Sequence, residues 1–372
     1  MRLVPVQRNR LPRPERVIYI KANLGTHGPD HMTDQTEAPE AGHPSRPGQA
    51  GPGTDVQVAD AVRRNWVDTR APAAWRPYLR LSRLDRPIGT WLLLLPCWWG
   101  LLLAAFSTGR FGFHDLWILA ACGVGAIVMR GAGCTWNDIT DRNIDDKVAR
   151  TRSRPLPSGQ VSTRGALVWM AAQCLVGLAI LLTFNWAAVG LGVASLGLVA
   201  IYPFAKRFTW WPQVFLGLAF NWGALLAWTA HTGSLGWPAV LLYLAGIAWT
   251  LFYDTIYAHQ DKEDDALIGV HSTARLFAER TPLWLRGFLV ISVVLMMLSV
   301  MIAAGPGANP LALALALGGA WGFGWHLAWQ LGRLNIDDTD CCLRLFRSNR
   351  NAGLIPVLFL AVAVLIRLNA GG

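Results

Sequence analysis

Charged residues are scarce in this chain. Asp, Glu, Lys and Arg together make up 15% of its 372 residues, whereas hydrophobic residues make up 53%. Soluble domains average about 25% charged residues, so the shortage argues against a soluble globular protein and favours a membrane protein. The 19 Trp residues agree with this interpretation, because Trp prefers the interfaces of a lipid bilayer.

Paired cysteine spacings are also missing. The six Cys residues contain no Cys-x-x-Cys pair, which argues against the usual structural zinc motifs. Four of them lie in apolar stretches, and the other two, Cys341 and Cys342, are adjacent in the chain. We therefore expect reduced thiols that have no metal-binding role.

A block of basic residues of the kind that binds nucleic acid is absent, although the net charge is +10. Lys and Arg instead lie mostly in short loops between long apolar stretches, which is the pattern of membrane topology. We therefore expect a lipid bilayer, and no nucleic acid, as the partner of this chain.

Residues 1–74 differ from the rest and lack a sustained apolar periodicity. They are rich in Pro, Gly, Arg and Asp, so we expect a disordered N-terminal extension. Residues 1–21 are basic but contain no Ser, which is unusual for a mitochondrial transit peptide. Met32 begins a more ordinary polar segment, and we hypothesise that translation starts there. An N-terminal mass that includes residues 1–31 would exclude this start.

Residues 75–372 are expected to form one transmembrane domain of the all-α class. Apolar stretches of roughly 18–22 residues, long enough to cross a bilayer as helices, alternate with short breaks. We predict nine spans, near residues 88–106, 114–136, 165–183, 186–204, 212–230, 237–257, 284–304, 309–330 and 353–369.

The loops between these spans alternate in charge. The segment before the first span and every second loop after it are basic, whereas the loops between carry almost no charge. The positive-inside rule then places the N-terminus in the cytoplasm and the C-terminus outside. Two acidic clusters, at residues 137–145 and 254–265, both fall on the cytoplasmic side.

The acidic clusters have helical spacing. Asp138 and Asp141 are three residues apart, and Asp145 follows Asp141 by four, so they share one helix face. Asp254 and Asp261 are two turns apart, and Asp265 follows by four. Carboxylate and amide oxygens suit Mg²⁺, which also keeps waters and substrate phosphates. We predict metal ligation by Asn137, Asp138, Asp141, Asp145, Asp254, Asp261 and Asp265.

Basic residues accompany the acidic clusters. Metal ions that bridge to a diphosphate, with Lys and Arg on its other oxygens, require this mixture of signs. Either acidic cluster taken alone is also compatible with a solvated surface. The candidate diphosphate contacts are Arg142, Lys147, Arg152, Arg154, Lys206 and Arg207.

The loop after the second predicted span is stiff. Pro155 and Pro157 prevent a helix from continuing, so this loop can fold over the opening at the membrane edge. Ser162 or Thr163 can cap the next helix. Arg130 lies inside the second span, and either reaches the membrane interface or faces a cavity.

Several segments resemble the UbiA prenyltransferase superfamily. Residues 133–142 (GCTWNDITDR) and 150–159 (RTRSRPLPSG) resemble its first aspartate-rich motif, and residues 253–265 (YDTIYAHQDKEDD) resemble its second. Residues 83–89 (RLDRPIG) and 202–209 (YPFAKRFT) resemble the 4-hydroxybenzoate polyprenyltransferase branch. The resemblance covers about residues 78–370.

This resemblance implies nine helices around a central cavity open to the cytoplasm, with the loops between spans 2 and 3 and spans 6 and 7 as a cap. It implies Mg²⁺-dependent transfer of a polyprenyl group from its diphosphate to 4-hydroxybenzoate, at the ring carbon ortho to the hydroxyl, in ubiquinone biosynthesis. By the same resemblance Arg86 contacts substrate, and the catalytic residues are Asp138, Asp141, Asp254 and Asp261.

Two positions depart from the superfamily pattern. Tyr257 stands where related members often carry Asp, which leaves fewer carboxylates in the second motif, although Asp264 or Asp265 can compensate. His271 replaces a Lys that is usual in this branch. His is only partly cationic near neutral pH, so the charge at this position differs.

Other functions stay open on the sequence alone. Another prenyl acceptor, such as a haem or a naphthoate, is the nearest alternative, and a diphosphate-binding scaffold without catalysis is another. A transporter or Mg²⁺ channel is less consistent with acidic groups at one membrane edge, because transporters place ionisable groups near the bilayer midplane. We expect a bacterial inner membrane, with the mitochondrial inner membrane as the alternative. Oligomeric state and prenyl chain length are left open.

Overall fold

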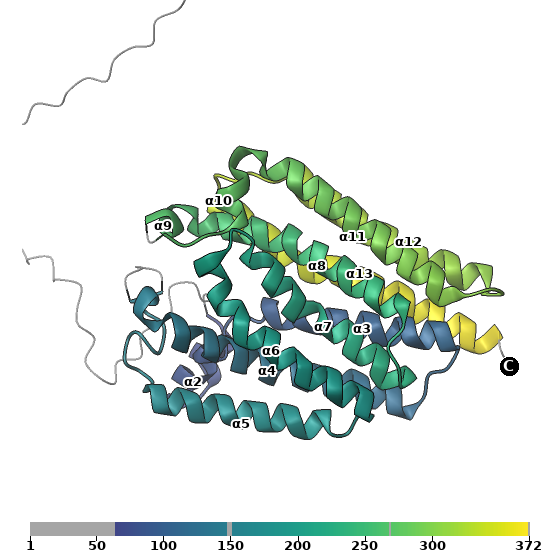
Figure 1. Cartoon of the computed structure of the whole chain (residues 1–372), viewed down its shortest axis with the longest axis horizontal. Helices are drawn as coiled ribbons and strands as arrows, with labels where there is room; N and C mark the ends of the chain where they lie inside the picture. The colour runs from purple at the N-terminus through teal and green to yellow at the C-terminus, as the bar shows by residue number, and fades with distance from the viewer. Residues whose placement is uncertain (1–63, 147–150, 268, 371–372) are drawn as a thin grey trace, which may run out of the picture. The chain divides into compact units, whose positions relative to one another are not determined.

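The computed structural model describes residues 64–146, 151–267 and 269–370. Within these ranges the regular structure is entirely helical (Figure 1). Of the predicted N-terminal extension, only residues 64–74 are described, and they include the short helix α1 (Trp66–Arg70).

Nine helices in the described ranges are long and apolar enough to cross a membrane, as the sequence predicted. They are α3 (Ile88–Thr108), α4 (Phe113–Asp145), α5 (Thr163–Leu181), α6 (Trp186–Phe208), α7 (Pro212–Thr232), α8 (Trp237–Ala258), α11 (Thr281–Ala304), α12 (Pro310–Gly332) and α13 (Thr339–Ala370). The short elements are α2 (Arg76–Leu81), the 3₁₀ turn η1 (His259–Asp261), α9 (Lys262–Leu267), α10 (Thr273–Phe277) and the 3₁₀ turn η2 (Ala278–Arg280).

The helix ends follow from local sequence. Ser162 caps α5 by accepting a hydrogen bond from the Gly165 backbone N–H at 3.1 Å, which was one of the two predicted caps. Two helices end at glycines in the left-handed conformation, α3 at Gly109 and α7 at Gly233. The apolar stretches therefore stop where capping chemistry allows the chain to turn.

The long helices follow one another around a ring. Each packs against the next, with α8 followed by α11, and α13 returns to pack against α3 (Figure 1). Of the neighbouring pairs, α5 and α6 touch least. The helices α3 and α8 are the most enclosed spans, each 72% buried over its most apolar window. The candidate site lies on the side of the ring formed by α3–α8.

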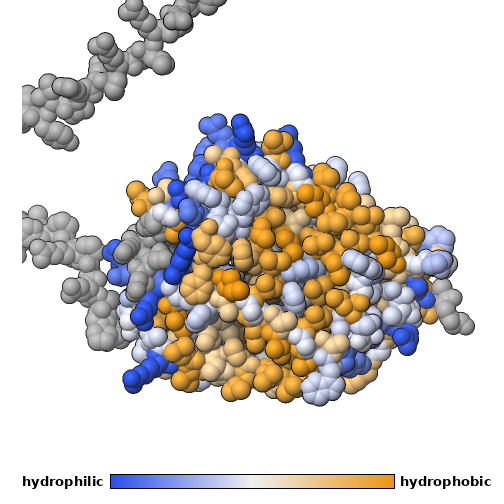
Figure 2. Space-filling view, in the orientation of Figure 1, coloured by the Kyte–Doolittle hydropathy of each residue, from blue (hydrophilic) through white to orange (hydrophobic). Residues whose placement is uncertain are grey.

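The surface has the distribution of a multi-pass membrane protein. Apolar residues cover the flank of the bundle, and hydrophilic residues gather toward the end that carries α9 (Figure 2). Exposed aromatic residues stand near helix ends, among them Trp186 and Trp237 at the starts of α6 and α8 and Phe208 at the end of α6. Such residues favour the two membrane interfaces.

Polar contacts join the buried helices. The Trp249 indole N–H of α8 donates to Asn349 Oδ1 of α13 at 2.9 Å, and the Asn349 amide donates to Gln330 Oε1 of α12 at 3.0 Å. Trp99 of α3 donates to the Gly353 carbonyl of α13 at 2.8 Å. At the far end, Arg367 of α13 donates to the carbonyls of Ser107 and Ala304, each at 3.3 Å. These bonds fix the last helix against α3, α8, α11 and α12.

Candidate active site

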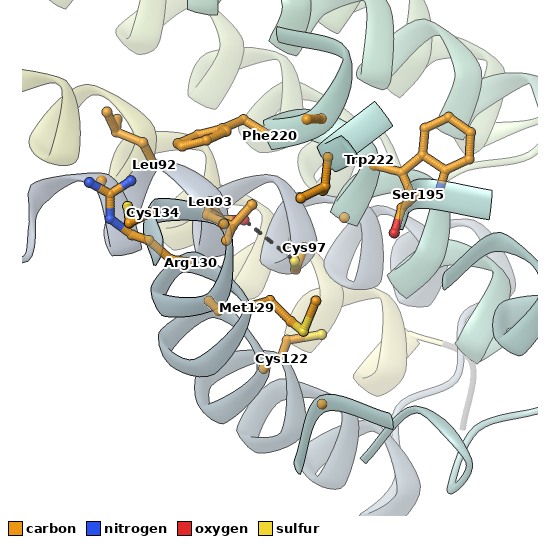
Figure 3. A pocket seen from close by; sticks show the side chains of 18 of the residues that line it. Leu92, Leu93, Cys97, Cys122, Met129, Arg130, Cys134, Ser195, Phe220 and Trp222 are labelled. Carbon is orange, nitrogen blue, oxygen red and sulfur yellow. Dashed lines mark hydrogen bonds between the residues drawn. The ribbon is translucent and has the colours of Figure 1, made fainter. Parts of the chain in front are cut away.

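A large apolar cavity lies among α3–α7. Its volume is about 770 Å³, and most of its lining is aliphatic, aromatic or thiol. Figure 3 shows part of this lining, which includes Leu92, Met129, Phe220 and Trp222, with Arg130 as the one cation among the labelled side chains. A cavity of this character suits a hydrocarbon chain.

A smaller polar cavity adjoins the apolar one. Its volume is about 310 Å³, and both predicted acidic clusters contribute to its wall. The two cavities share lining residues from α4, α6, α7, α8 and the loop before α5, so they meet at a common rim. The shared residues are Asn137, Arg154, Tyr202, Leu216, Asp254 and Tyr257.

The acidic residues of the polar cavity come from two distant parts of the chain. Asn137 and Asp145 lie at the end of α4, whereas Asp254, Asp261 and Asp265 lie on α8, η1 and α9. The α4 helix continues to Asp145, well beyond the predicted span, and thereby carries its acidic residues out of the apolar region. The two clusters therefore border one cavity, as a shared metal site requires.

Asp138 and Asp141 lie behind the cavity wall. Both are fully buried and neither lines either cavity. Asp138 pairs with Arg83 at 2.5 Å and with Arg154 at 3.5 Å. Asp141 pairs with Lys206 at 2.5 Å. A second cation, at 3.1 Å from the Asp141 carboxylate, is Arg207. These two carboxylates therefore hold cations in place.

Asp145 is both a cavity residue and an ion-pair partner. Its Oδ2 lies 2.8 Å from Arg154 Nη1. Burial raises the pKa of Asp145 above its usual value, while the neighbouring Arg154 acts to lower it. The Thr151 hydroxyl donates to the Asp145 carbonyl at 2.8 Å and anchors the loop that carries Arg154.

The predicted diphosphate contacts divide into two groups. Arg154 and Lys206 line the polar cavity, and Arg86 lines the apolar cavity beside Asp85. Three others line neither cavity. Arg142 bonds Thr163 Oγ1 at 3.4 Å, Arg152 bonds the Asp146 carbonyl at 3.1 Å and Arg207 bonds the Thr140 carbonyl at 2.8 Å. Lys147 lies outside the described residues.

Arg130 faces the apolar cavity, which decides between the two orientations that the sequence left open. Its Nε is buried and has no hydrogen-bond partner among the described residues, and its Cζ lies 5.8 Å from the centre of the Phe220 ring. The guanidinium lies directly against Gly89, where a Cβ atom would come within 2.0 Å of Cζ. Only glycine at position 89 leaves room for this arrangement.

Arg83 and Tyr202 were not predicted as site residues. Arg83 is buried, lines the apolar cavity and has a φ of 57°, which is uncommon for a residue other than glycine. Tyr202 lies on the common rim and donates to the Gly133 carbonyl at 3.2 Å. Both belong to segments that resemble the superfamily, and that position is the signal that could have identified them.

The two departures from the superfamily pattern both border the polar cavity. Tyr257 lines both cavities, with its ring 4.3 Å from that of Phe346. His271 lines the polar cavity, and its backbone N–H donates to the Lys206 carbonyl at 3.2 Å.

The donor set suits Mg²⁺ in the presence of a phosphate ligand. Among the described residues, no group of three or more His, Cys, Asp or Glu side chains is arranged to hold a metal ion alone. Mg²⁺ characteristically binds one or two carboxylates and completes its shell with waters and substrate phosphates. Hard oxygen donors beside Arg154 and Lys206 meet that requirement.

Comparisons with known proteins agree with this geometry. A family model described as the UbiA prenyltransferase family matches residues 93–349. A relative from Mus musculus named 4-hydroxybenzoate polyprenyltransferase, mitochondrial, is 48% identical over 315 residues, which are 84% of this chain and 81% of the relative. Relatives of the same name occur in Aedes aegypti (50% identity, 77% of this chain, 63% of the relative) and Homo sapiens (46%, 77% and 75%).

Solved structures show the same fold. A UbiA homolog from Archaeoglobus fulgidus bound to GPP and Mg²⁺ matches with a TM-score of 0.57 at 20% identity, over 79% of this chain and 99% of that one. A UbiA homolog from Aeropyrum pernix K1 matches with a TM-score of 0.54 at 22% identity, over 74% and 97%. Both the family model and the relatives cover most of the described domain. This chain belongs to the UbiA prenyltransferase family.

Proposed function

We propose that this protein transfers a polyprenyl group from polyprenyl diphosphate to the ring carbon of 4-hydroxybenzoate ortho to the hydroxyl, in ubiquinone biosynthesis. One observation carries the proposal: a polar cavity bordered by both acidic clusters opens into an apolar cavity. The names of the relatives, at about 50% identity, support the acceptor and the reaction.

The polar cavity receives the diphosphate. Arg154 and Lys206 face it, and the buried carboxylates of Asp138 and Asp141 keep these cations in position. Mg²⁺ would be held by Asn137, Asp145, Asp254, Asp261 and Asp265, and would act as a Lewis acid on the leaving diphosphate. Stabilisation of that charge grows as the C–O bond breaks, so it lowers the barrier selectively.

The apolar cavity receives the prenyl chain. Its lining excludes water from the allylic carbon, which would otherwise be hydrolysed as positive charge develops. Tyr253 and Tyr257 line this cavity near the rim, and aromatic faces stabilise nearby positive charge. As the allylic C–O bond breaks, its electron pair leaves with the diphosphate. The ring carbon of the acceptor forms the new C–C bond, and the ring proton then passes to the released diphosphate.

Arg130 is suited to hold the acceptor carboxylate. It lines the apolar cavity, one face of its guanidinium lies against Gly89, and its Nε has no partner within the described ranges. Arginine binds carboxylate with two parallel hydrogen bonds, which would fix the orientation of the benzoate ring.

Of the residues that the structure describes, Asp254 is the one acidic residue that lines the apolar cavity. This distribution does not favour an ion channel.

We infer the membrane that holds this protein from the names of its relatives. The relatives from Mus musculus, Aedes aegypti and Homo sapiens carry "mitochondrial" in their names, which favours the mitochondrial inner membrane over the bacterial inner membrane that the sequence first suggested. The basic loops would place the polar cavity on the cytoplasmic side, or on the matrix side in a mitochondrion.

Prenyl transfer in isolated membranes tests the proposal. Membranes containing the protein are incubated with 4-hydroxybenzoate, a polyprenyl diphosphate and Mg²⁺, and the prenylated product is quantified with and without a chelator. We expect product only without chelator. Arg130→Leu should raise the KM for 4-hydroxybenzoate by about tenfold or more, because a hydrogen-bonded carboxylate loses its cation. Absence of product with the wild-type chain would refute the proposal.

A further inference from the structure

Three buried polar atoms in side chains that line the polar cavity lack a hydrogen-bond partner among the residues that the structure describes. They are Arg154 Nε, His271 Nδ1 and Ser272 Oγ. Arg154 is already a candidate diphosphate contact, whereas His271 and Ser272 have no assigned role. Buried polar atoms are normally paired, so unpartnered atoms in the wall of a cavity indicate a ligand.

Ser272 precedes the first residue of α10 but does not cap this helix with its side chain. Ser272 occupies the N-cap of α10, but its hydroxyl makes no capping bond. Gln213 of α7 instead accepts the backbone N–H of Thr273, the first residue of α10, with Oε1 at 3.2 Å. Ser272 is only 4% exposed and lines the polar cavity, and its hydroxyl has no partner among the described residues.

The His271 ring is fixed in place. Its backbone N–H is bonded to Lys206, and its ring lies 4.2 Å from the ring of Trp210. Arg275 lies over the same Trp210 ring at 5.4 Å, and it donates to the carbonyls of Asp265 and Val270. Because the backbone and one face of the ring are held, Nδ1 is preorganised for a ligand.

The other side chains of the polar cavity indicate the chemical class of that ligand. The acidic residues are suited to metal ions. Arg154 Nη1 and Lys206 Nζ are paired with carboxylates, whereas Arg154 Nε has no partner among the described residues. A diphosphate carries several oxygens, and those that do not bind metal need hydrogen-bond donors. A hydroxyl and an imidazole N–H supply such donors.

We infer that His271 and Ser272 bind the terminal phosphate of the prenyl diphosphate by donating from Nδ1 and Oγ. This inference rests on the proposed function. His271 stands where the resemblance places a Lys, and it would offer a hydrogen-bond donor there in place of a permanent charge.

The experiment measures two ligands. For His271→Phe, His271→Lys and Ser272→Ala, we determine the KM for polyprenyl diphosphate and for 4-hydroxybenzoate in membranes. Binding of inorganic pyrophosphate with Mg²⁺ is measured by calorimetry on the purified protein, and this needs no prenyl transfer. We expect His271→Phe and Ser272→Ala each to raise the KM for polyprenyl diphosphate and the dissociation constant for pyrophosphate by about tenfold, because each loses a hydrogen bond to a charged group. His271→Lys should retain wild-type values, and the KM for 4-hydroxybenzoate should not change.

Matched controls use exposed residues that line neither cavity. His114→Phe on α4 and Ser234→Ala between α7 and α8 should leave both readings unchanged. Thermal unfolding in detergent identifies any variant that is misfolded, and only folded variants are compared. Unchanged pyrophosphate binding in folded His271→Phe and Ser272→Ala would overturn the inference. Normal pyrophosphate binding by a wild-type chain that transfers no prenyl group would instead refute the proposed function alone.

Discussion

Asp141 and Asp254 look equivalent in the sequence, yet the structure gives them different surroundings. Asp141 is fully buried between Lys206 and Arg207, whereas Asp254 lies on the rim of both cavities. Helical spacing correctly predicts that the acidic residues of α4 form a stripe. It does not determine which residues of that stripe meet a neighbouring cation, because that depends on the packing of α6 and α2.

This difference predicts two distinct defects. Asp254→Asn should raise the Mg²⁺ concentration for half-maximal prenyl transfer by roughly 10- to 100-fold. This is the typical loss of metal affinity when a residue of a metal site is replaced. Asp141→Asn should raise the KM for polyprenyl diphosphate about tenfold, since Lys206 loses the partner of its charged hydrogen bond. Its Mg²⁺ requirement should stay near that of the wild type. The measurement is initial rate against Mg²⁺ and against diphosphate.

The control for both is Asp340→Asn, an exposed residue that lines neither cavity. An equal rise in Mg²⁺ requirement for Asp141→Asn and Asp254→Asn would show that Asp141 is a metal ligand rather than a residue that holds Lys206 in position.

At the scale of helices, hydropathy predicts well that a membrane-spanning helix is present but predicts poorly where that helix begins and ends. All nine spans were predicted, but α13 begins at Thr339 whereas its span was expected from residue 353. The missed part carries Arg344, Arg347 and Arg350, which lowers its hydropathy. Its buried residues nevertheless follow helical spacing, which is a signal that a hydropathy window overlooks. They are Cys341, Cys342, Leu345, Phe346, Asn349 and Ala352.

Asn349 in this missed part links three helices, so its replacement should be costly. Asn349→Leu removes the acceptor of the Trp249 indole N–H and the donor to Gln330 Oε1, although Gln330 keeps its bond to His326. We expect a loss of about 1–3 kcal/mol of stability, the usual cost of unsatisfied buried polar groups. Thermal unfolding in detergent measures it. Asn351→Leu, an exposed position on the same helix, is the control and should unfold near the wild-type temperature. Equal stability of the two variants would contradict the role of the network.

At the scale of the molecule, the ring has an open flank. Leu175 and Leu178 of α5 and Val193 and Leu196 of α6 line the apolar cavity, and all four are 44–66% exposed. The cavity therefore reaches the lipid-facing surface between α5 and α6, the pair that touches least. A long prenyl chain can extend through this opening.

Partial closure of the opening should discriminate between donors by length. Leu178→Trp places a bulky ring at the opening, so transfer from a long polyprenyl diphosphate should fall severalfold while transfer from a short allylic diphosphate persists. The ratio of the two rates in membranes is the measurement. Val168→Trp on α5 is exposed but lines neither cavity, and should leave the ratio unchanged. A similar loss with both donors would argue against this route.

The sequence predicts part of this architecture. Alternating loop charges place both acidic clusters on one side of the membrane, and the structure brings them to one cavity. Hydropathy cannot predict which spans are neighbours, because every lipid-compatible helix has a similar profile. The return of α13 to α3 and the loose contact of α5 with α6 depend on side-chain fit, such as the bond from Trp99 to Gly353.

The attachment of α13 also bears on biosynthesis. Arg367, in the last turns of α13, binds the ends of α3 and α11. Without α13, the side of α3 that packs against it would be uncovered. Among the spans that the structure describes, the first to be synthesised therefore completes its packing only after the last has been made. A chain that stops before α13 would leave this side of α3 uncovered in the membrane.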